Sequence, residues 1–276
     1  MWIIELAIKI FLWITIFTFI LNQYERLNYP DDNEGFDFML IFSFIWEIVA
    51  DVVIWVLYFV GFYNFDTKII SKEKEFPIVF IPGYTMNRGY FFLYAKGLQK
   101  RGYNVFVFSP KKIFDSISDI AMQLEYKVDE VLKETGKDKV ILVGHSMGGL
   151  LARYYTQRLS GKPHVVKIIT IGTPHFGTKL SPFGYGKNAR DMEVNSKFLS
   201  DLNKDVDELQ KNVKLLSILS KSDNLVIPYQ NSILPNFEKY IVDHLGHNSL
   251  MISSEIYGKI VNELEKTEFE FKNEQK

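Results

Sequence analysis

Two long apolar segments open the chain, and short apolar segments alternate with amphipathic ones after them. The first apolar segment covers residues 2–21 and is interrupted only by Glu5 and Lys9, and the second covers residues 36–65. Each is long enough to cross about 30 Å of hydrocarbon as a helix. A polar stretch, 22–35, joins them, so the pattern predicts a helical hairpin.

The charges within the hairpin leave two interpretations open. An acidic group at the centre of a membrane costs about 2.5–3.5 kcal/mol. Glu5 and Lys9 can neutralise each other, because residues four apart share a helix face, but Glu47 and Asp51 share a face as two acids and need a partner or water. Antiparallel packing brings this pair level with residues 15–19, which hold no base. The hairpin either spans a membrane or lies against the following domain and the membrane surface.

From Phe76 onward the pattern predicts an α/β fold with a mostly parallel sheet and helices on both faces. Six short apolar segments are the expected strands: 77–81, 104–108, 139–143, 166–171, 214–219 and 239–242. Five segments have helical spacing: 90–101, 116–134, 147–159, 196–210 and 249–265. Residues 266–276 are mostly polar and are expected to fray.

The resulting domain prediction is a membrane-associated hairpin at 1–70, a catalytic domain at 71–265 and a polar tail at 266–276. Because the expected strands and helices form a complete set after residue 76, we expect the catalytic domain to close its own core. Removal of residues 1–70 would then spare activity on a soluble substrate, whereas an equal loss on soluble and membrane substrates would indicate a structural cap.

Composition narrows the possible functions. Apolar residues make up 47% of the 276 residues and charged residues 24%, which is typical of a folded protein. The net charge of −1 gives no reason to expect a nucleic-acid partner. The chain has no cysteine, so disulfides, a thiolate nucleophile and a cysteine-ligated zinc site are excluded.

Charge is unevenly distributed along the chain. Residues 1–62 hold two bases and eight acids, together with all four tryptophans, whereas the remainder has an excess of five bases. The loop between the apolar segments has one base, Arg26, but Lys68, Lys72 and Lys74 closely follow the second segment. Basic residues close to the ends of a membrane segment usually lie on its cytoplasmic side. The catalytic domain is therefore expected at the membrane, on its cytoplasmic side.

One short sequence carries the chemistry. The apolar segment 140–143 runs into Gly144-His145-Ser146-Met147-Gly148, and a helical pattern follows at once. This strand–turn–helix setting is the one that a nucleophile elbow requires. The flanking glycines remove side chains that would collide at a strained turn, so Ser146 is the candidate nucleophile. The alternative is a glycine-rich turn whose serine has no chemical role.

A serine nucleophile needs a histidine base and an acid that orients it. Asp223 follows the strand at 214–219 directly and is the candidate acid, while the acids between 201 and 207 suit a solvated helix face. Two histidines follow it, His244 and His247. His247 is favoured as the base, because it ends the loop after the last strand and follows a flexible glycine.

The tetrahedral intermediate of acyl transfer needs backbone N–H donors for its oxyanion. One is expected from Met147, which follows the nucleophile. The other is expected from the loop after the first strand, where Gly83 permits close approach and Tyr84 supplies the N–H. A further segment, 179–190, is rich in glycine and aromatic residues, and it forms either a mobile wall of the acyl pocket or only a long connection.

Together these motifs resemble α/β-hydrolase fold serine lipases and esterases, near bacterial triacylglycerol lipases and GPI inositol-deacylase-like proteins. The matching sequences are Ile-Pro-Gly at 81–83, Gly-Tyr-Asn-Val at 102–105, Gly-His-Ser-Met-Gly-Gly at 144–149, Ile-Gly-Thr-Pro-His-Phe-Gly-Thr at 171–178, Ser-Asp at 222–223 and Gly-His at 246–247. The resemblance covers residues 76–265 and implies an acyl-enzyme mechanism without a cofactor. Some relatives bind structural calcium, but this sequence offers no recognisable set of metal ligands, so no metal is predicted. Pro82 departs from it, since many such lipases have histidine there.

We therefore expect a membrane-associated serine hydrolase of carboxylic esters, with Ser146, Asp223 and His247 as its triad. The substrate is an ester of lipid or lipid-like character, and residues 1–65 contact membrane lipids. No nucleic-acid or protein partner is predicted. Two alternatives keep the same fold: an acyltransferase that uses the same triad, and a membrane scaffold without activity.

Overall fold

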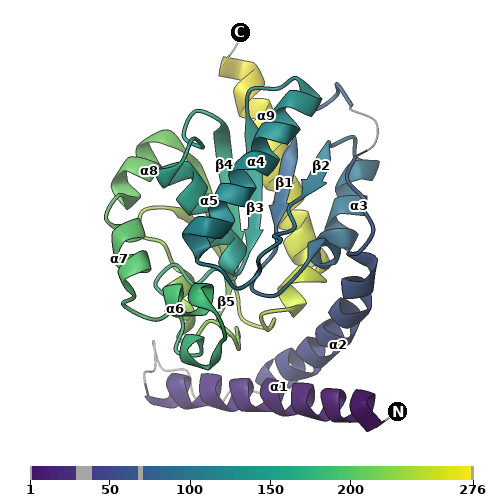
Figure 1. The fold of residues 1–276 in the computed structure, drawn as a ribbon, viewed down its shortest axis with the longest axis vertical. Coiled ribbons are helices and arrows are strands. Elements are labelled where there is room, and N and C mark those ends of the chain that lie inside the picture. The colour runs from purple at the N-terminus through teal and green to yellow at the C-terminus, as the bar shows by residue number, and fades with distance from the viewer. Residues whose placement is uncertain (1, 29–38, 68–70, 275–276) are drawn as a thin grey trace.

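The computed structural model describes residues 2–28, 39–67 and 71–274, and its centre is a six-stranded parallel sheet (Figure 1). The spatial order of the strands is β2-β1-β3-β4-β5-β6, and every neighbouring pair is parallel. The strands are β1 Ile78–Ile81, β2 Val105–Val107, β3 Val140–His145, β4 Val165–Ile171, β5 Lys214–Ser220 and β6 Glu238–Val242. The predicted fold class and all six predicted strands are confirmed.

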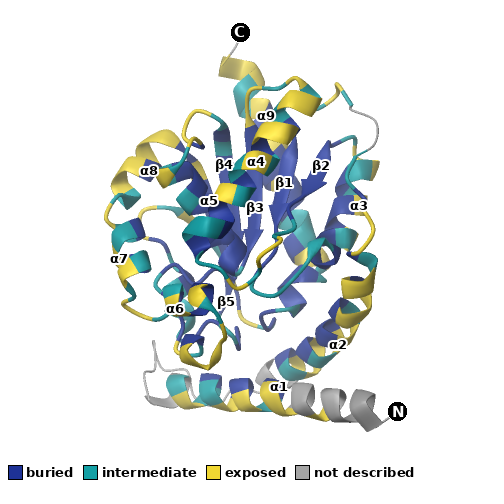
Figure 2. Ribbon diagram, in the orientation of Figure 1, coloured by how far each residue is buried: buried dark blue, intermediate teal, exposed yellow. Residues whose placement is uncertain are grey.

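Helices cover both faces of the sheet. One face packs against α3 (Phe92–Lys100) and α9 (Ser254–Glu274), and the other against α4 (Ile117–Thr135) and α5 (Met147–Arg158). The strands are almost wholly buried (Figure 2), because a parallel sheet with helices on both sides has no solvent face. Shorter helical pieces complete the layers: η1 Arg88–Phe91, η2 Ser181–Phe183, α6 Lys187–Asp191, α7 Lys197–Asn203, α8 Val206–Asn212, η3 Tyr229–Ser232 and η4 Ser249–Met251.

Two sequence predictions need correction in this domain. The helix expected at 196–210 is divided into α7 and α8, which flank Lys204 and Asp205. The tail expected to fray from 266 continues α9 through Glu274, while residues 275–276 lie outside the described residues. Glu268 accepts the Glu75 N–H at 2.9 Å, so the part of α9 around Glu268 is bound to the fold.

The predicted hairpin is present as α1 (Trp2–Asn28) and α2 (Met39–Val60), while most of the connection expected at 22–35 lies outside the described residues. The two helices lie across the end of the sheet at which the strands finish (Figure 1). The two helices contact each other where the ring of Phe19 in α1 packs edge-on against that of Phe44 in α2, with centroids 5.1 Å apart. Glu47 and Asp51 of α2 are buried against the domain, and Thr15 donates to Asp51 at the level expected from antiparallel packing.

The C-terminal end of α2 packs backbone to backbone on the domain. A Cβ atom on Gly89 would lie 1.9 Å from the Leu57 carbonyl oxygen, and one on Gly61 would lie 2.0 Å from the Asn87 side chain. Ile54 belongs to the same buried cluster as the β1 and β3 side chains. Helix α2 therefore contributes a side chain to the buried core on this face of the sheet.

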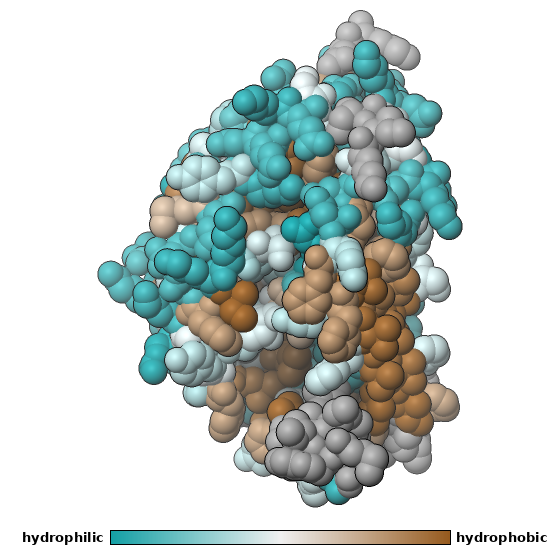
Figure 3. Space-filling model, turned by 45° about the vertical axis from the view of Figure 1, so that its right-hand side comes forward, coloured by the Kyte–Doolittle hydropathy of each residue, from teal (hydrophilic) through white to brown (hydrophobic). Residues whose placement is uncertain are grey.

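The outer face of the hairpin is apolar. In Figure 3 hydrophobic side chains gather low on the molecule, over this part of the chain, and hydrophilic ones cover the upper part. The exposed side chains include Trp13, Phe17, Phe42, Trp46, Trp55 and Phe59. Within the described residues, one helical segment, Phe42–Val60, is long and apolar enough to cross a membrane. Since this segment also carries the buried acids, its packing on the domain favours the interpretation of a surface-lying hairpin.

The contact at Gly89 generates a stability prediction. Gly89→Ala should lower the free energy of unfolding by about 1–3 kcal/mol, because a backbone carbonyl of α2 would have to move aside. Urea unfolding measures the loss, and limited proteolysis should show earlier cleavage in the hairpin. Gly258→Ala in α9 is the control, since its Cβ would meet nothing within 4 Å and should leave stability equal or raised by up to about 1 kcal/mol. Equal stability of Gly89→Ala and the wild type would contradict this docking.

Candidate active site

Ser146 lies at the sharp turn between β3 and α5. Its backbone has φ 54° and ψ −126°, a conformation that L-residues rarely adopt, and its side chain makes no capping bond to the helix that follows. The Ser146 N–H donates to the Ile171 carbonyl at 2.8 Å, which fixes the turn to the end of β4. The half-buried hydroxyl is thus held at the carboxyl end of the central strands.

The glycines on either side of Ser146 are required by close packing. A Cβ on Gly144 would lie 2.4 Å from the Gly148 carbonyl carbon, and one on Gly148 would lie 2.0 Å from the Ile81 carbonyl oxygen. Any side chain at either position would push α5 away from β1 and β3. The two glycines therefore have the steric role that the sequence analysis assigns to them.

Asp223 and His247 form a buried pair, although 24 residues separate them. The His247 Nδ1–H donates to both carboxylate oxygens of Asp223, at 2.8 and 3.0 Å, and the side chains are 3% and 1% exposed. Asp223 also accepts the N–H groups of Leu225 and Val226, which fixes its rotamer. The sequence analysis expected these two residues to meet, and the structure brings them together.

The surroundings of His247 favour its charged form. Burial by itself lowers the pKa of the imidazole, but the adjacent Asp223 carboxylate outweighs burial, and the more distant Glu47 and Asp51 add to it. The net result is a pKa above the usual 6.5. A base that must accept a proton and hold it beside a carboxylate needs this balance.

Contacts at Gly172 show that Ser146 and the Asp223–His247 pair share one site. A Cβ on Gly172, the residue after β4, would lie 3.1–3.2 Å from Asp223 and His247. Gly172 directly follows Ile171, whose carbonyl receives the Ser146 N–H. The elbow, the acid and the base therefore surround the end of a single strand.

The two residues expected to bind the oxyanion also lie at this end of the sheet. A Cβ on Gly83 would lie 2.9 Å from the Ser146 Cβ, so the loop carrying Tyr84 passes beside the elbow. Met147 is the first residue of α5. Neither backbone N–H bonds to another group in the described part of the chain, which leaves both donors available.

The segment 179–190 lies beside this loop. The Tyr84 hydroxyl donates to the Tyr185 carbonyl at 2.6 Å and accepts the Tyr185 N–H at 2.8 Å. The ring of Phe183 packs edge-on against Phe17 of α1, with centroids 6.1 Å apart. The segment therefore joins the oxyanion loop to the hairpin.

The remaining histidines lie away from the proton-transfer position. His244 is partly exposed and pairs with Asp243 and Glu255. His175 is buried against Arg153, and both burial and that guanidinium lower its pKa. His145 packs on His247, with ring centroids 4.5 Å apart, and its Nε2–H donates to the His247 carbonyl at 3.2 Å.

Sequence reasoning missed a polar network between the hairpin and the site. Asn224 accepts the His247 N–H at 3.0 Å, and its amide donates to Thr18 of α1 at 3.0 Å. Asn22 of α1 donates to the Asp223 carbonyl at 2.5 Å. The sequence analysis had no signal for these contacts, since the acids within the apolar segment indicated only that Glu47 and Asp51 needed partners.

The two acids of α2 contact the loop that follows His247. The oxygens of Glu47 accept the N–H groups of Asn248 and Ser249 at 2.7 and 2.8 Å, and Asp51 accepts the Asn248 amide at 2.7 Å. Burial, together with the neighbouring Asp51, raises the pKa of Glu47 to about 8 against the opposing pull of those N–H groups. Burial raises the pKa of Asp51 to about 6.

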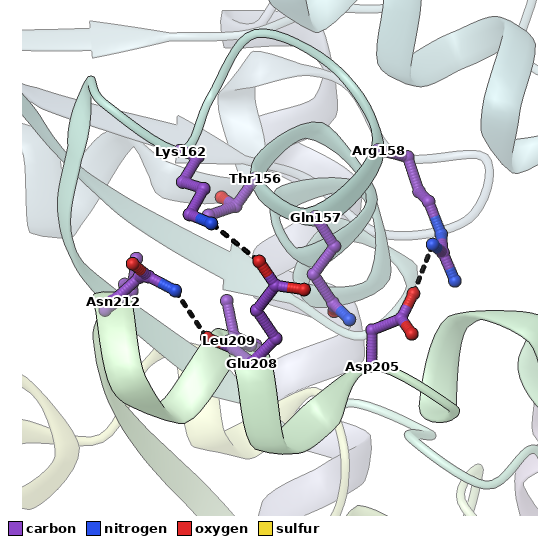
Figure 4. A pocket seen from close by; sticks show the side chains of 9 residues that line it. Thr156, Gln157, Arg158, Lys162, Asp205, Glu208, Leu209 and Asn212 are labelled. Carbon is purple, nitrogen blue, oxygen red and sulfur yellow. Dashed lines mark hydrogen bonds and ion pairs between the residues drawn. The ribbon is translucent and has the colours of Figure 1, made fainter.

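Other features of the described chain are separate from this site. A pocket of about 130 Å³ lies between α8 and the C-terminal end of α5, whereas the elbow is at the N-terminal end of α5 (Figure 4). Lys162 pairs with Glu208 across it at 2.6 Å, and Arg158 pairs with Asp205. Among the described residues no three His, Asp or Glu side chains lie together as a metal site would require.

Comparison with known proteins identifies the fold family and finds distant similarity to lipases. The family described as "alpha/beta hydrolase fold" matches residues 77–214. Triacylglycerol lipases of Pseudarthrobacter phenanthrenivorans and Burkholderia plantarii are each 37% identical over 97 residues, which is 34% of this chain. The chain spans only 30% and 26% of these relatives' lengths.

Solved structures show the same fold at low identity. The mature Bacillus licheniformis lipase BlEst2 has a TM-score of 0.63 and 18% identity, over 72% of this chain and 95% of that one. Lipase B of Aspergillus fumigatus has a TM-score of 0.59 and 14% identity, over 68% of this chain and 52% of that one.

The raised pKa values of the α2 acids predict how stability depends on pH. The pKa of the Glu47 carboxyl rises from 4.5 to about 8 on folding. Its contribution to the free energy of unfolding is fully present below about pH 4.5 and is lost as the pH rises toward 8. The free energy of unfolding should therefore fall between pH 5 and pH 8. Asp51, His247 and Tyr90 face Glu47, and a raised His247 pKa acts in the same direction.

Glu47→Gln isolates the contribution of Glu47, because an amide does not titrate. Urea unfolding at pH 5 and pH 8 should show a fall that is smaller by about 1 kcal/mol or more in Glu47→Gln than in the wild type. The same fall in both proteins would show that Glu47 does not change its protonation on unfolding.

Proposed function

This chain belongs to the α/β hydrolase fold family, and on that premise we propose that it is a serine hydrolase of carboxylic esters. The observation that carries the proposal is the buried Asp223–His247 pair, with Nδ1 2.8 Å from the carboxylate, beside the left-handed Ser146 at the end of β3. An acid, a base and a strained serine at one strand end are the parts that acyl transfer requires. The distant similarity to triacylglycerol lipases supports the same reaction class.

In the proposed mechanism, His247 takes the hydroxyl proton of Ser146 as its oxygen attacks the ester carbon. Asp223 accepts the Nδ1–H throughout, so Nε2 faces the nucleophile and the imidazolium is stabilised. The carbonyl oxygen becomes an oxyanion, which the N–H groups of Tyr84 and Met147 bind. His247 then protonates the leaving alcohol, and water activated by His247 releases the acid from Ser146.

We propose that the substrate is a lipid or lipid-like ester that the enzyme meets at a membrane surface. The outer face of the hairpin carries exposed tryptophans at 13, 46 and 55, a side chain that prefers the interface between water and lipid. The inner face of the same helices contacts the site, so adsorption would bring the end of the sheet toward the lipid. The excess of basic residues after position 62 would favour an anionic surface. The predicted cytoplasmic orientation stays a prediction.

The triad is tested by single substitutions. Ser146→Ala and His247→Ala should each reduce kcat for a soluble short-chain ester by about 10⁴-fold or more, because the nucleophile and base act as a unit. His244→Ala is the matched control and should keep near wild-type activity. The reverse order of the two histidine variants would refute the assignment of the base. Product analysis with an added alcohol tests the alternative of acyl transfer.

Membrane contact is tested with the three exposed tryptophans. Replacing Trp13, Trp46 and Trp55 with serine should weaken binding to vesicles that contain anionic lipid by about tenfold or more, because less apolar surface enters the interface. Activity on an emulsified long-chain ester should fall with it, while activity on a soluble ester is kept. A variant with Tyr126→Ser and Phe269→Ser, which are exposed outside the hairpin, should bind vesicles as the wild type does. Unchanged binding by the tryptophan variant would refute this contact surface.

A further inference from the structure

Glu47 holds the backbone of the loop that carries the proposed base. Its two oxygens accept the N–H groups of the two residues that directly follow His247, at 2.7 and 2.8 Å. The carboxyl is fully buried, and a Cβ on Gly246 would lie 2.4 Å from it. The loop therefore passes over Glu47 on both sides of His247, and glycine at 246 is what allows the carboxyl to come so close.

Asp51, one turn further along α2, holds a side chain of the same loop. It accepts the side-chain amide N–H of Asn248 at 2.7 Å, and the side-chain Oδ1 of Asn248 accepts the Tyr90 hydroxyl at 2.7 Å. Tyr90 packs on His145, with ring centroids 4.7 Å apart, and His145 donates to the His247 carbonyl. These contacts connect α2 to the elbow turn through buried groups.

Helix α1 holds the acid in the same manner. Asn22 donates to the Asp223 backbone carbonyl at 2.5 Å. Thr18 accepts the amide of Asn224, whose oxygen receives the His247 N–H. Both helices of the hairpin thus contact the acid–base half of the site.

We propose that Glu47 and Asp51 are positioning residues that set the place of His247, so that the hairpin is part of the catalytic unit. The proposal rests on the proposed function, because it gives His247 the role of base. Burying two acids on an apolar helix costs free energy that well-packed apolar side chains would avoid. Both acids lie on one face of α2, and each is bonded to the loop of the base. A role in holding that loop in place explains why they are there. A displacement of about 1 Å at a catalytic group can cost about 100-fold in rate.

The test compares two full-length variants of α2. Glu47→Gln keeps the size of the side chain but presents an amide N–H₂ to one of the two backbone N–H groups, so it should displace the loop. We expect kcat to fall by about 10- to 100-fold with little change in KM. Ile54→Ala is the matched control: it removes core packing from the same helix but no hydrogen bond to the loop, so it should lower stability but keep the kcat of the folded protein.

A second measurement does not depend on activity. Hydrogen exchange followed by mass spectrometry should show faster exchange of the 246–250 amides in Glu47→Gln than in the wild type, and no such change in Ile54→Ala under conditions where both stay folded. Glu47→Asp should exchange at a rate nearer to Glu47→Gln than to the wild type, because the shorter side chain does not reach both N–H groups.

The outcomes separate this proposal from the proposed function. A wild-type protein without Ser146-dependent ester hydrolysis would refute the proposed function. Faster exchange of the 246–250 amides in Glu47→Gln than in the wild type would still show that Glu47 holds the loop. An active wild type whose kcat and 246–250 exchange are unchanged by Glu47→Gln would overturn the positioning role. Equal losses of kcat in Glu47→Gln and Ile54→Ala would overturn it as well, since the effect would then be one of stability.

Discussion

The strained backbone conformation of Ser146 is held in place by the strands and the helix around it. A left-handed residue other than glycine costs about 1–3 kcal/mol and persists only where neighbouring contacts enforce it. Here β3 fixes the residue before it, α5 fixes the residues after it, and the N–H of Ser146 is tied to the end of β4. Gly144 and Gly148 allow strand and helix to come that close. The turn depends on a parallel sheet whose central strands end together.

The same geometry explains why the acid and the base converge although they are distant from Ser146 in sequence. In a parallel sheet the carboxyl ends of all strands lie at the same end of the sheet, so the loops after β5 and β6 begin on the same side as the elbow. Asp223 follows β5 and His247 follows β6, and β5 and β6 are neighbours in the sheet. Strand alternation and chain order led the sequence analysis to Asp223 and left two histidines, of which His247 was favoured by its place at the end of the loop.

What the sequence could not provide was the long-range packing of polar groups. The pattern at 254–274 loses its apolar character after residue 265, yet α9 continues because Glu268 caps the N–H groups of residues 75 and 76. Likewise Glu47 and Asp51 were recognised as acids in need of partners. The partners of Glu47 are backbone amides 201 and 202 residues away, and those of Asp51 are the side chains of Asn248 and Thr15. Backbone donors carry no signature in a sequence, so contacts of this kind remain invisible until the chain is folded.

The hairpin also shows why apolar length is an ambiguous signal. A membrane span and a helix that packs on a domain with one face and meets lipid with the other have nearly the same composition. The two differ in the positions of the charges: on α2 both acids lie on the face that packs against the His247 loop, and Trp46 and Trp55 lie on the exposed face. Turning α2 into a lipid-surrounded span would strip Glu47 and Asp51 of the donors they bind, at a cost of several kcal/mol each. The acids therefore do two things at once: they hold the loop of the proposed base and they keep the apolar helix seated on the domain.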